Sequence, residues 1–211
     1  MIRFLYANEL GNHSKLAHDM FVDRAKQFKE RLGWDVHVDS AGEERDQYDM
    51  LDPLYVIWEE QDGGHGGSMR FLPTTGRTMT NEHFLHLTDG VRVESPFIWE
   101  CTRFCLTEGA RPQIAAALML AGSELMRGHG VEHFLGVFDA PMERVYRHIG
   151  ASPEVLGSTG AGRTKTSVGL WAYTPEAKAK LVAKAGLSEA VMRQWYERAF
   201  GQRPSVKSAV A

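Results

Sequence analysis

One charged residue limits how the first long helix of this chain can pack. Apolar side chains recur at every fourth position and form one stripe of an amphipathic helix: Leu16, Met20, Phe28 and Leu32. Position 24 belongs to the same stripe, and it is Arg24. A guanidinium stays protonated in a protein, so its burial requires carboxylates around it. Asp46 and Asp49 follow the helix and Arg70 lies in a strand-like segment. The sequence therefore predicts a partly buried charged cluster of these four residues.

The composition is typical of a globular domain. The chain has 211 residues, enough for one sizeable core, and its net charge of −3 provides no basic footprint for nucleic acid. Cys101 and Cys105 lie in an apolar segment and lack the spacing of a disulfide framework or a zinc site. They indicate a reducing compartment. No segment has the length of a membrane span or the pattern of a signal peptide, so we expect a cytoplasmic protein without a membrane partner.

The order of the predicted elements favours a mixed sheet flanked by helices. Strands are expected at residues 1–6, 34–38, 54–59, 68–73, 97–106, 134–138, near 155 and at 168–173. Helices are expected from about residue 14 to 33, near 81–87, at 112–126 and 141–149, and from residues 175 and 188. Hairpins and helical crossovers both occur, which predicts an α/β fold. We expect a single domain over residues 1–201 and a flexible tail at 202–211.

The predicted strand at residues 97–106 carries two charges, Glu100 and Arg103. In a regular strand they point to opposite sides, so they can serve one site only if a β-bulge or the strand end lies there. An ion pair or an edge charge is the structural alternative. The apolar neighbours of Glu100 should desolvate its carboxylate and raise its pKa toward the range of a general base. Glu100 is therefore a candidate base.

A glycine-rich segment from Gly157 to Thr164 is similar to a phosphate-binding loop. It has Arg163 where that loop needs a lysine, and a strand-like segment follows where a helix is required. A hairpin loop is the favoured interpretation, and a non-enzymatic nucleotide-binding module is the weaker one. The histidines show no metal-ligand spacing, and His65, in a run of glycines, is expected to face solvent.

The charged and aromatic residues together form a recognisable set. Its eight positions occur in this order: Arg24, Phe28, Trp34, Asp46, Asp49, Arg70, Glu100 and Arg103. The local context agrees in Arg31-Leu-Gly-Trp-Asp-Val, in Arg70-Phe-Leu-Pro and in Glu100-x-x-Arg-Phe. With this set the chain resembles the acyl-homoserine-lactone synthases, the LuxI-type autoinducer synthases. The resemblance is close over about the first half of the chain, and from Arg111 onward only the order of elements matches.

The resemblance implies a fold similar to that of the GNAT N-acetyltransferases. In this three-layer sandwich, helices flank a mixed β-sheet that splays between two central strands, here residues 97–106 and 133–138. The amine substrate would be S-adenosylmethionine (SAM), and the acyl donor a thioester on acyl carrier protein or coenzyme A. After acylation the lactone ring closes and methylthioadenosine leaves, with no cofactor or metal, to give a quorum-sensing signal. A general GNAT N-acyltransferase acting on another amine is the alternative. The pyrophosphate-binding signature of that superfamily is missing near Glu108.

The resemblance also implies roles for individual residues. The expected catalytic residues are Arg24, Asp46, Asp49, Arg70, Glu100 and Arg103. Glu100 would accept the proton of the substrate ammonium, directly or through water, and backbone amides at an irregular point of its strand would stabilise the oxyanion. Carboxylates and aromatic faces suit the ammonium and sulfonium groups, and arginines suit the substrate carboxylate. The residues expected to bind SAM are Phe28, Trp34, Arg103 and Phe104.

The acyl chain is expected in an apolar pocket beside the helix at residues 112–126. Its expected lining is Leu118, Leu135, Gly136, Val137, Met142 and Leu170. In the family a hydroxyl-bearing residue near Gly136 tends to accompany 3-oxo chains, so we expect a chain without a 3-oxo group. An acidic carrier protein would need a basic patch. The candidates for that patch are Arg144, Arg147, Arg163 and Lys165. Carrier protein and coenzyme A both stay open as donors, and so does the oligomeric state.

Overall fold

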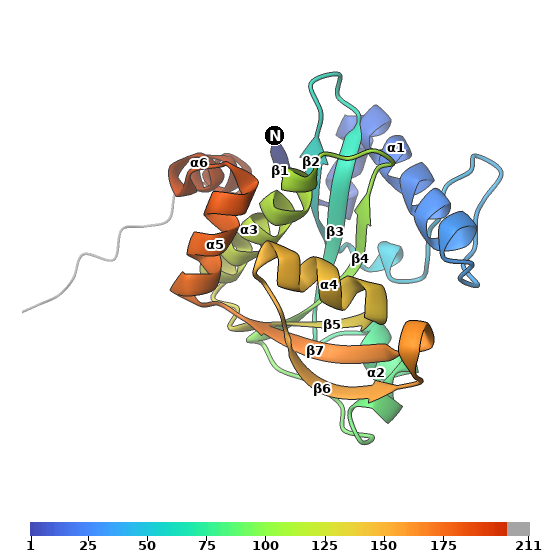
Figure 1. Cartoon of the computed structure of the whole chain (residues 1–211). Helices are drawn as coiled ribbons and strands as arrows, with labels where there is room; N and C mark the ends of the chain where they lie inside the picture. Colours follow the sequence, from blue (N-terminus) through green and yellow to red (C-terminus); the bar gives the residue numbers. More distant parts are fainter. Residues whose placement is uncertain (202–211) are drawn as a thin grey trace, which may run out of the picture.

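A computed structural model describes residues 1–201 of the protein (Figure 1). The predicted tail at 202–211 lies outside this range. The strands are β1 (Ile2–Tyr6), β2 (Leu54–Glu59), β3 (His65–Pro73), β4 (Ile98–Leu106), β5 (His133–Asp139), β6 (Glu154–Thr159) and β7 (Thr166–Ala172). The α-helices are α1 (Ser14–Arg24), α2 (Met79–His83), α3 (Pro112–His129), α4 (Ala140–Ile149), α5 (Pro175–Ala185) and α6 (Glu189–Phe200). Shorter helical segments are η1 (Ala7–His13), η2 (Ala25–Arg31), η3 (Asp49–Leu51), η4 (Leu85–Leu87) and η5 (Gly162–Thr164).

All seven of these strands belong to one sheet, in the order β1-β2-β3-β4-β5-β7-β6. Neighbours are antiparallel except β4 and β5, which pair in parallel only from Ile98 to Glu100. Beyond Glu100 the two strands separate, and β5 continues beside β7 (Figure 1). The predicted mixed sheet, and its splay between these two strands, are confirmed.

Helices cover both faces of the sheet because alternate residues of the first strands enter different cores. Leu54 and Val56 of β2 pack in the core that contains α3. Tyr55 and Ile57 pack in the core that contains α1. A strand that is buried on both faces has a continuous apolar sequence, as β2 does at Leu54-Tyr-Val-Ile.

The first long helix changes its geometry where it reaches the charged residues. α1 ends at Arg24, and η2 continues it as a π-helix to Arg31 before Gly33 turns the chain with φ of 67°. π-Helical turns inside helices are frequent at functional sites. The predicted stripe is confirmed for Leu16, Met20, Arg24 and Phe28, which are all buried, whereas Leu32 at its end is only half-buried.

Two local predictions are wrong. Residues 34–38 do not form a strand, because the chain turns back at once through the hydrogen bond from Asp39 N to Glu43 O, and only the single bridge between Val38 and Glu44 forms. His65 does not face solvent. β3 begins at His65, three residues earlier than predicted, and its buried ring lies 2.9 Å from Asp23 Oδ2 and 3.0 Å from Ser68 Oγ.

The glycine-rich segment forms the hairpin of the favoured interpretation. Gly157 lies in β6, and η5 connects β6 to its antiparallel partner β7, so no helix follows the loop. No helix within residues 1–201 is long and apolar enough to cross a membrane. The same residues contain no group of three or more His, Cys, Asp or Glu side chains placed to hold a metal ion.

Candidate active site

The predicted charged cluster forms between α1, the loop after it and β3. Arg24 is 1% exposed and makes a bidentate pair with Asp49, with Nη1–Oδ1 at 3.0 Å and Nη2–Oδ2 at 2.9 Å. Arg70 is fully buried and donates to both oxygens of Asp46, at 2.5 and 2.9 Å, and to Asp49 Oδ1 at 2.7 Å. Its Nε donates to Thr102 Oγ1 at 3.0 Å. Both buried guanidinium groups are therefore paired with carboxylates.

Sequence reasoning missed one member of the cluster, Glu44. This fully buried carboxylate accepts from Arg24 Nε at 2.6 Å and from Arg103 Nη2 at 2.8 Å. Arg103 also lies 2.8 Å from Asp46 Oδ2. A signal existed in the sequence, because three clustered arginines need a third carboxylate beside the two aspartates. The charged cluster thus consists of Arg24, Glu44, Asp46, Asp49, Arg70 and Arg103.

Asp46 and Asp49 of the charged cluster remain ionised at neutral pH. Burial acts to raise the pKa of Asp49, but Arg24 and Arg70 outweigh it and hold the pKa well below its usual range. Burial acts on Asp46 in the same direction, and Arg70 again prevails, so the pKa of Asp46 is also lowered. Tyr55 adds a hydrogen bond from its hydroxyl to Asp49 Oδ1 at 2.5 Å. The cluster therefore presents fixed charges in a desolvated setting.

A β-bulge in β4 turns Arg103 toward the charged cluster. Ser68 of β3 lies opposite Cys105, whereas Arg70 lies opposite Thr102, so β4 contains one extra residue between these pairs. Arg103 has φ of 54°, in the left-handed region that residues other than glycine seldom adopt. The irregular point predicted for this strand is thereby confirmed.

The carboxylate of Glu100 is bound at the start of α2. Its carboxylate is 1% exposed and accepts the backbone N–H groups of Met79, at 3.0 Å, and Thr80, at 2.6 Å. Burial raises the pKa of Glu100, as predicted, although the two amides moderate the shift. Glu100 therefore both anchors α2 and carries a carboxyl group that is easier to protonate than usual.

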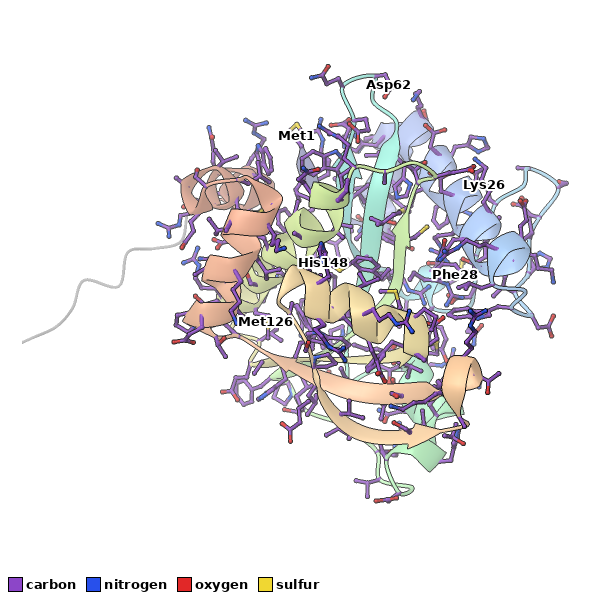
Figure 2. The ribbon with its side chains drawn as sticks, in the orientation of Figure 1. Met1, Lys26, Phe28, Asp62, Met126 and His148 are labelled. Atoms are coloured by element: carbon purple, nitrogen blue, oxygen red, sulfur yellow. The ribbon has the colours of Figure 1, made fainter. Side chains whose placement is uncertain are left out.

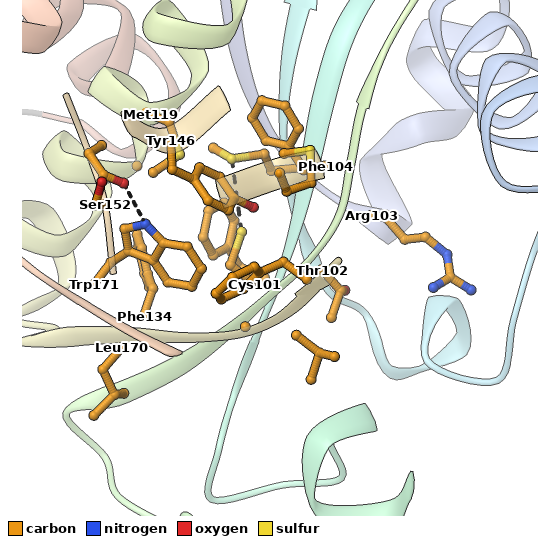
Figure 3. Close-up of a pocket in the computed structure, with 18 of the residues that line it drawn as sticks. Cys101, Thr102, Arg103, Phe104, Met119, Phe134, Tyr146, Ser152, Leu170 and Trp171 are labelled. Carbon is orange, nitrogen blue, oxygen red and sulfur yellow. Dashed lines mark hydrogen bonds between the residues drawn. The ribbon is translucent and has the colours of Figure 1, made fainter. Parts of the chain in front are cut away.

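A central cavity of about 380 Å³ lies in the splay between β4 and β5 and is closed by residues of α3, α4, β7 and α5. All four residues expected to bind SAM line it: Phe28, Trp34, Arg103 and Phe104. The rings of Phe28 and Trp34 stack at 5.1 Å with an interplanar angle of 18°, and the Arg103 guanidinium lies 5.3 Å from the Phe28 ring centre. Figure 3 shows Arg103 extended away from the apolar group around Trp171 and Tyr146. Arg103 thus connects the charged cluster to the central cavity.

Four of the six residues predicted for the acyl pocket line the cavity: Gly136, Val137, Met142 and Leu170. Leu118 and Leu135 do not. Leu118 points from α3 into the core, where its Cδ1 approaches Gly67. Leu135 packs with Val168 in a separate cluster. The lining that sequence reasoning missed includes Met119, Gly122, Met126, Phe134, Tyr146 and Trp171. Neighbouring positions on a helix or strand face different ways, so a shift of one position exchanges core for cavity.

Gly136 has little free space beside its backbone. A Cβ atom at Gly136 would lie 3.0 Å from Cζ3 of Trp171 and 3.1 Å from the carbonyl oxygen of Cys101. The Trp171 ring is fixed by a hydrogen bond from Nε1 to the carbonyl of Ala151 at 2.8 Å (Figure 3). Trp171 therefore fills the place beside the glycine and shapes this wall of the cavity.

A mixed sheet that splays around a cavity between β4 and β5 places the protein in the class of GNAT-like folds. Comparison with known proteins identifies the family within this fold class. The autoinducer synthase family model matches residues 7–180. An acyl-homoserine-lactone synthase of Rhizobium etli is 39% identical over 183 residues, which cover 83% of this chain and 86% of that protein. The chain therefore belongs to the autoinducer synthase family, the acyl-homoserine-lactone synthases, which are acyltransferases of quorum sensing.

Solved structures agree with this assignment. The crystal structure of the AHL synthase LasI is 26% identical with a TM-score of 0.75, over 87% of this chain and 94% of that one. BjaI, a CoA-dependent acyl-homoserine lactone synthase solved with SAM and isopentyl-CoA, is 22% identical with a TM-score of 0.79. That match covers 90% of each chain, and at this identity it shows the fold.

Proposed function

We propose that the protein transfers an acyl group from a thioester to the amino group of SAM and then closes the homoserine lactone. The observation that carries the proposal is the central cavity, which joins an apolar gap in the sheet to the aromatic pair Phe28 and Trp34 and to Arg103. A substrate that is cationic and aromatic suits one end, and an acyl chain suits the other. The solved structure of BjaI with SAM and isopentyl-CoA supports both assignments.

In this proposal the aromatic pair and the charged cluster receive SAM. The adenine and sulfonium groups of SAM match the aromatic faces of Phe28 and Trp34. Asp46 is the carboxylate of the cluster with the most accessible side chain, 13% exposed, and it would attract the ammonium. Arg103, which lines the cavity, would hold the substrate carboxylate. Arg24, Asp49 and Arg70 would keep these groups in position through the ion pairs described above.

Glu100 is the proposed general base. The SAM ammonium must lose a proton before its nitrogen can attack the thioester carbon, and the raised pKa of Glu100 suits it to accept that proton, directly or through water. Two backbone amides bind its oxygens, but each carboxylate oxygen has a further lone pair. Backbone amides at the β4 bulge would stabilise the oxyanion of the tetrahedral intermediate.

The reaction then proceeds by two substitutions. A C–N bond forms at the acyl carbon, the C–S bond of the thioester breaks, and the thiolate takes up a proton. The carboxylate oxygen of the acylated SAM next attacks the carbon that bears the sulfonium. The second C–S bond breaks, the ring closes, and methylthioadenosine leaves with the electron pair. This scheme requires no cofactor and no metal.

The acyl donor is proposed to be a thioester of coenzyme A or of acyl carrier protein. Arg144 and Arg147 of α4 and Arg163 of η5 are exposed and would meet an acidic carrier. We further propose that residues 1–201 act as one catalytic domain and that the protein works in the cytoplasm, where Cys101 and Cys105 would stay free thiols, as they are here.

Mass spectrometry of the reaction tests this proposal. Purified protein is incubated with SAM and a panel of acyl thioesters on both carriers, and we expect equal amounts of an acyl-homoserine lactone and methylthioadenosine. Glu100→Gln should fold and lose at least about a hundredfold in kcat, which is the typical contribution of a general base. Acylation of a different amine would favour the general N-acyltransferase instead, and a fully active Glu100→Gln variant would exclude Glu100 as the base.

A further inference from the structure

The central cavity has a second end, far from the charged cluster. Phe28 lines the cavity beside α1, and Met126 lines it on α3. Figure 2 labels both residues and shows them on opposite sides of α4. On the side of Met126 the wall includes Ala177, Lys178 and Leu181, all from α5. An acyl chain that starts near Arg103 and follows the cavity therefore approaches the interface between α3 and α5.

The wall at this far end includes a buried lysine, Lys178. Lys178 is 6% exposed, and its Nζ lies 2.7 Å from Glu189 Oε2 and 3.7 Å from Glu124 Oε2. Glu124 is 1% exposed although it belongs to the apolar helix α3, and it also pairs with Arg127. These pairs connect α3, α5 and α6 around the end of the cavity. We refer to Lys178, Glu124 and Glu189 as the Lys178 cluster.

We propose that the Lys178 cluster ends the acyl pocket and sets the longest acyl chain that the enzyme accepts. This inference rests on the proposed function. Along the apolar walls each additional methylene is removed from water, which favours the longer chain. A methylene pressed against Lys178 would replace polar surroundings of the ammonium or separate it from its carboxylates, and both changes are unfavourable. The gain from chain length therefore stops at this point.

Substitutions at positions 177 and 178 should change the length of the pocket in opposite directions. Ala177 lines the same wall and has a small side chain. A leucine at position 177 would extend into the cavity before the Lys178 cluster and leave the ion pairs intact. A longer pocket should result from Lys178→Met, which keeps the unbranched stem and removes the charge. Glu124 would still pair with Arg127, and Glu189, whose side chain is 50% exposed, would be hydrated.

The test measures kcat/KM over a series of saturated straight-chain acyl thioesters, from butanoyl to octadecanoyl, on the carrier that the enzyme uses. For the unchanged protein we expect a rise of up to about fourfold per methylene until the chain reaches the Lys178 cluster, followed by a fall. Lys178→Met should move the maximum to a longer chain by at least one two-carbon step. Ala177→Leu should move it to a shorter chain. Lys184→Met changes an exposed lysine of the same helix and should leave the profile unchanged.

The outcomes separate the two proposals. If the unchanged protein makes lactone but neither variant moves the maximum, the inference about the Lys178 cluster is overturned and the proposed function stands. If no thioester gives a lactone with the unchanged protein, the proposed function itself fails. Should Lys178→Met not fold, Ala177→Leu decides, because an unmoved maximum in that variant places the end of the pocket elsewhere.

Discussion

The charged cluster and the central cavity lie next to each other and are built in opposite ways. In the cluster the six side chains are nearly all buried, and each charge has a partner of opposite sign. In the cavity the walls are mostly apolar and come from separate strands and helices. A change in the cluster leaves a buried charge with fewer partners, whereas a change at an apolar residue of the cavity wall alters mainly the volume of the cavity. We therefore expect cluster variants to lose stability and activity together, and variants at apolar cavity residues to change substrate binding with little loss of stability.

The largest effect is expected for Arg70→Met. The variant leaves Asp46 and Asp49 with one partner fewer in a buried site, which should lower the free energy of unfolding by about 3–5 kcal/mol and abolish lactone formation. Urea denaturation measures the loss. The matched control is Arg3→Met, because Arg3 pairs with Glu59 with 30% of its side chain exposed. It should cost no more than about 1 kcal/mol. Equal losses in the two variants would remove the distinction between buried and exposed pairs.

A cavity variant, Met142→Trp, should have the next largest effect. Met142 lies in the first turn of α4 and lines the cavity, so a tryptophan there narrows the space for the acyl chain. We expect kcat/KM for the longest accepted thioester to fall about tenfold to a hundredfold, while the free energy of unfolding changes by less than about 1.5 kcal/mol. Met50→Trp is the control, since Met50 is 85% exposed and lies outside the cavity. A large loss of stability in Met142→Trp would show that the cavity wall is as tightly constrained as the cluster.

Trp34→Ala should mainly weaken the binding of SAM. Trp34 is 41% exposed, so its loss should lower the free energy of unfolding by only about 1 kcal/mol, although the stack with Phe28 disappears. The dissociation constant for SAM, measured by calorimetry, should rise about fivefold to tenfold. The control is Phe97→Ala, an exposed aromatic residue that does not line the cavity. An unchanged dissociation constant in Trp34→Ala would remove the aromatic pair from the proposed SAM site.

The smallest effect is the dependence of stability on pH. The pKa values of Asp46 and Asp49 are lowered in the folded protein, so both carboxyl groups bind protons more readily after unfolding. Their contribution is complete above the unfolded pKa of about 4 and is lost as the pH falls through the folded values. Denaturation curves of the unchanged protein should therefore show that the free energy of unfolding declines below about pH 4. The decline should be shallower in Asp49→Asn and should be the same as in the unchanged protein in Met142→Trp. An equal decline in all three proteins would assign it to other groups.

The two regions also differ in how far the sequence predicts them. Arg24 stands out because a cation interrupts an apolar stripe, and the need for counter-charges leads directly to Asp46 and Asp49. For Glu100 and Arg103 to serve one site, the sequence required either a β-bulge or the strand end near them, and the structure has the bulge. The same argument could have predicted Glu44, since the three arginines Arg24, Arg70 and Arg103 require one carboxylate more than the two aspartates.

The residues that line the apolar part of the cavity could not all be predicted by this reasoning. Leu118 and Met119 are neighbours with similar hydropathy, yet Leu118 fills the core and Met119 lines the cavity. Both are apolar residues of α3, and only the direction of the side chain separates them. The same reason explains His65, because a polar residue in a glycine run gives no sign of the buried Asp23 that faces it. Tertiary packing decides these cases.

The central claim is that SAM binds beside the charged cluster and that the acyl chain occupies the far part of the cavity. Hydrogen–deuterium exchange with each ligand alone tests it most directly. SAM should protect backbone amides in residues 24–49 and 98–106. An acyl thioether of the same carrier, which cannot react, should protect residues 133–149 and 166–181. Protection of only residues 133–181 by SAM, or of residues 24–49 by the acyl analogue alone, would contradict the account.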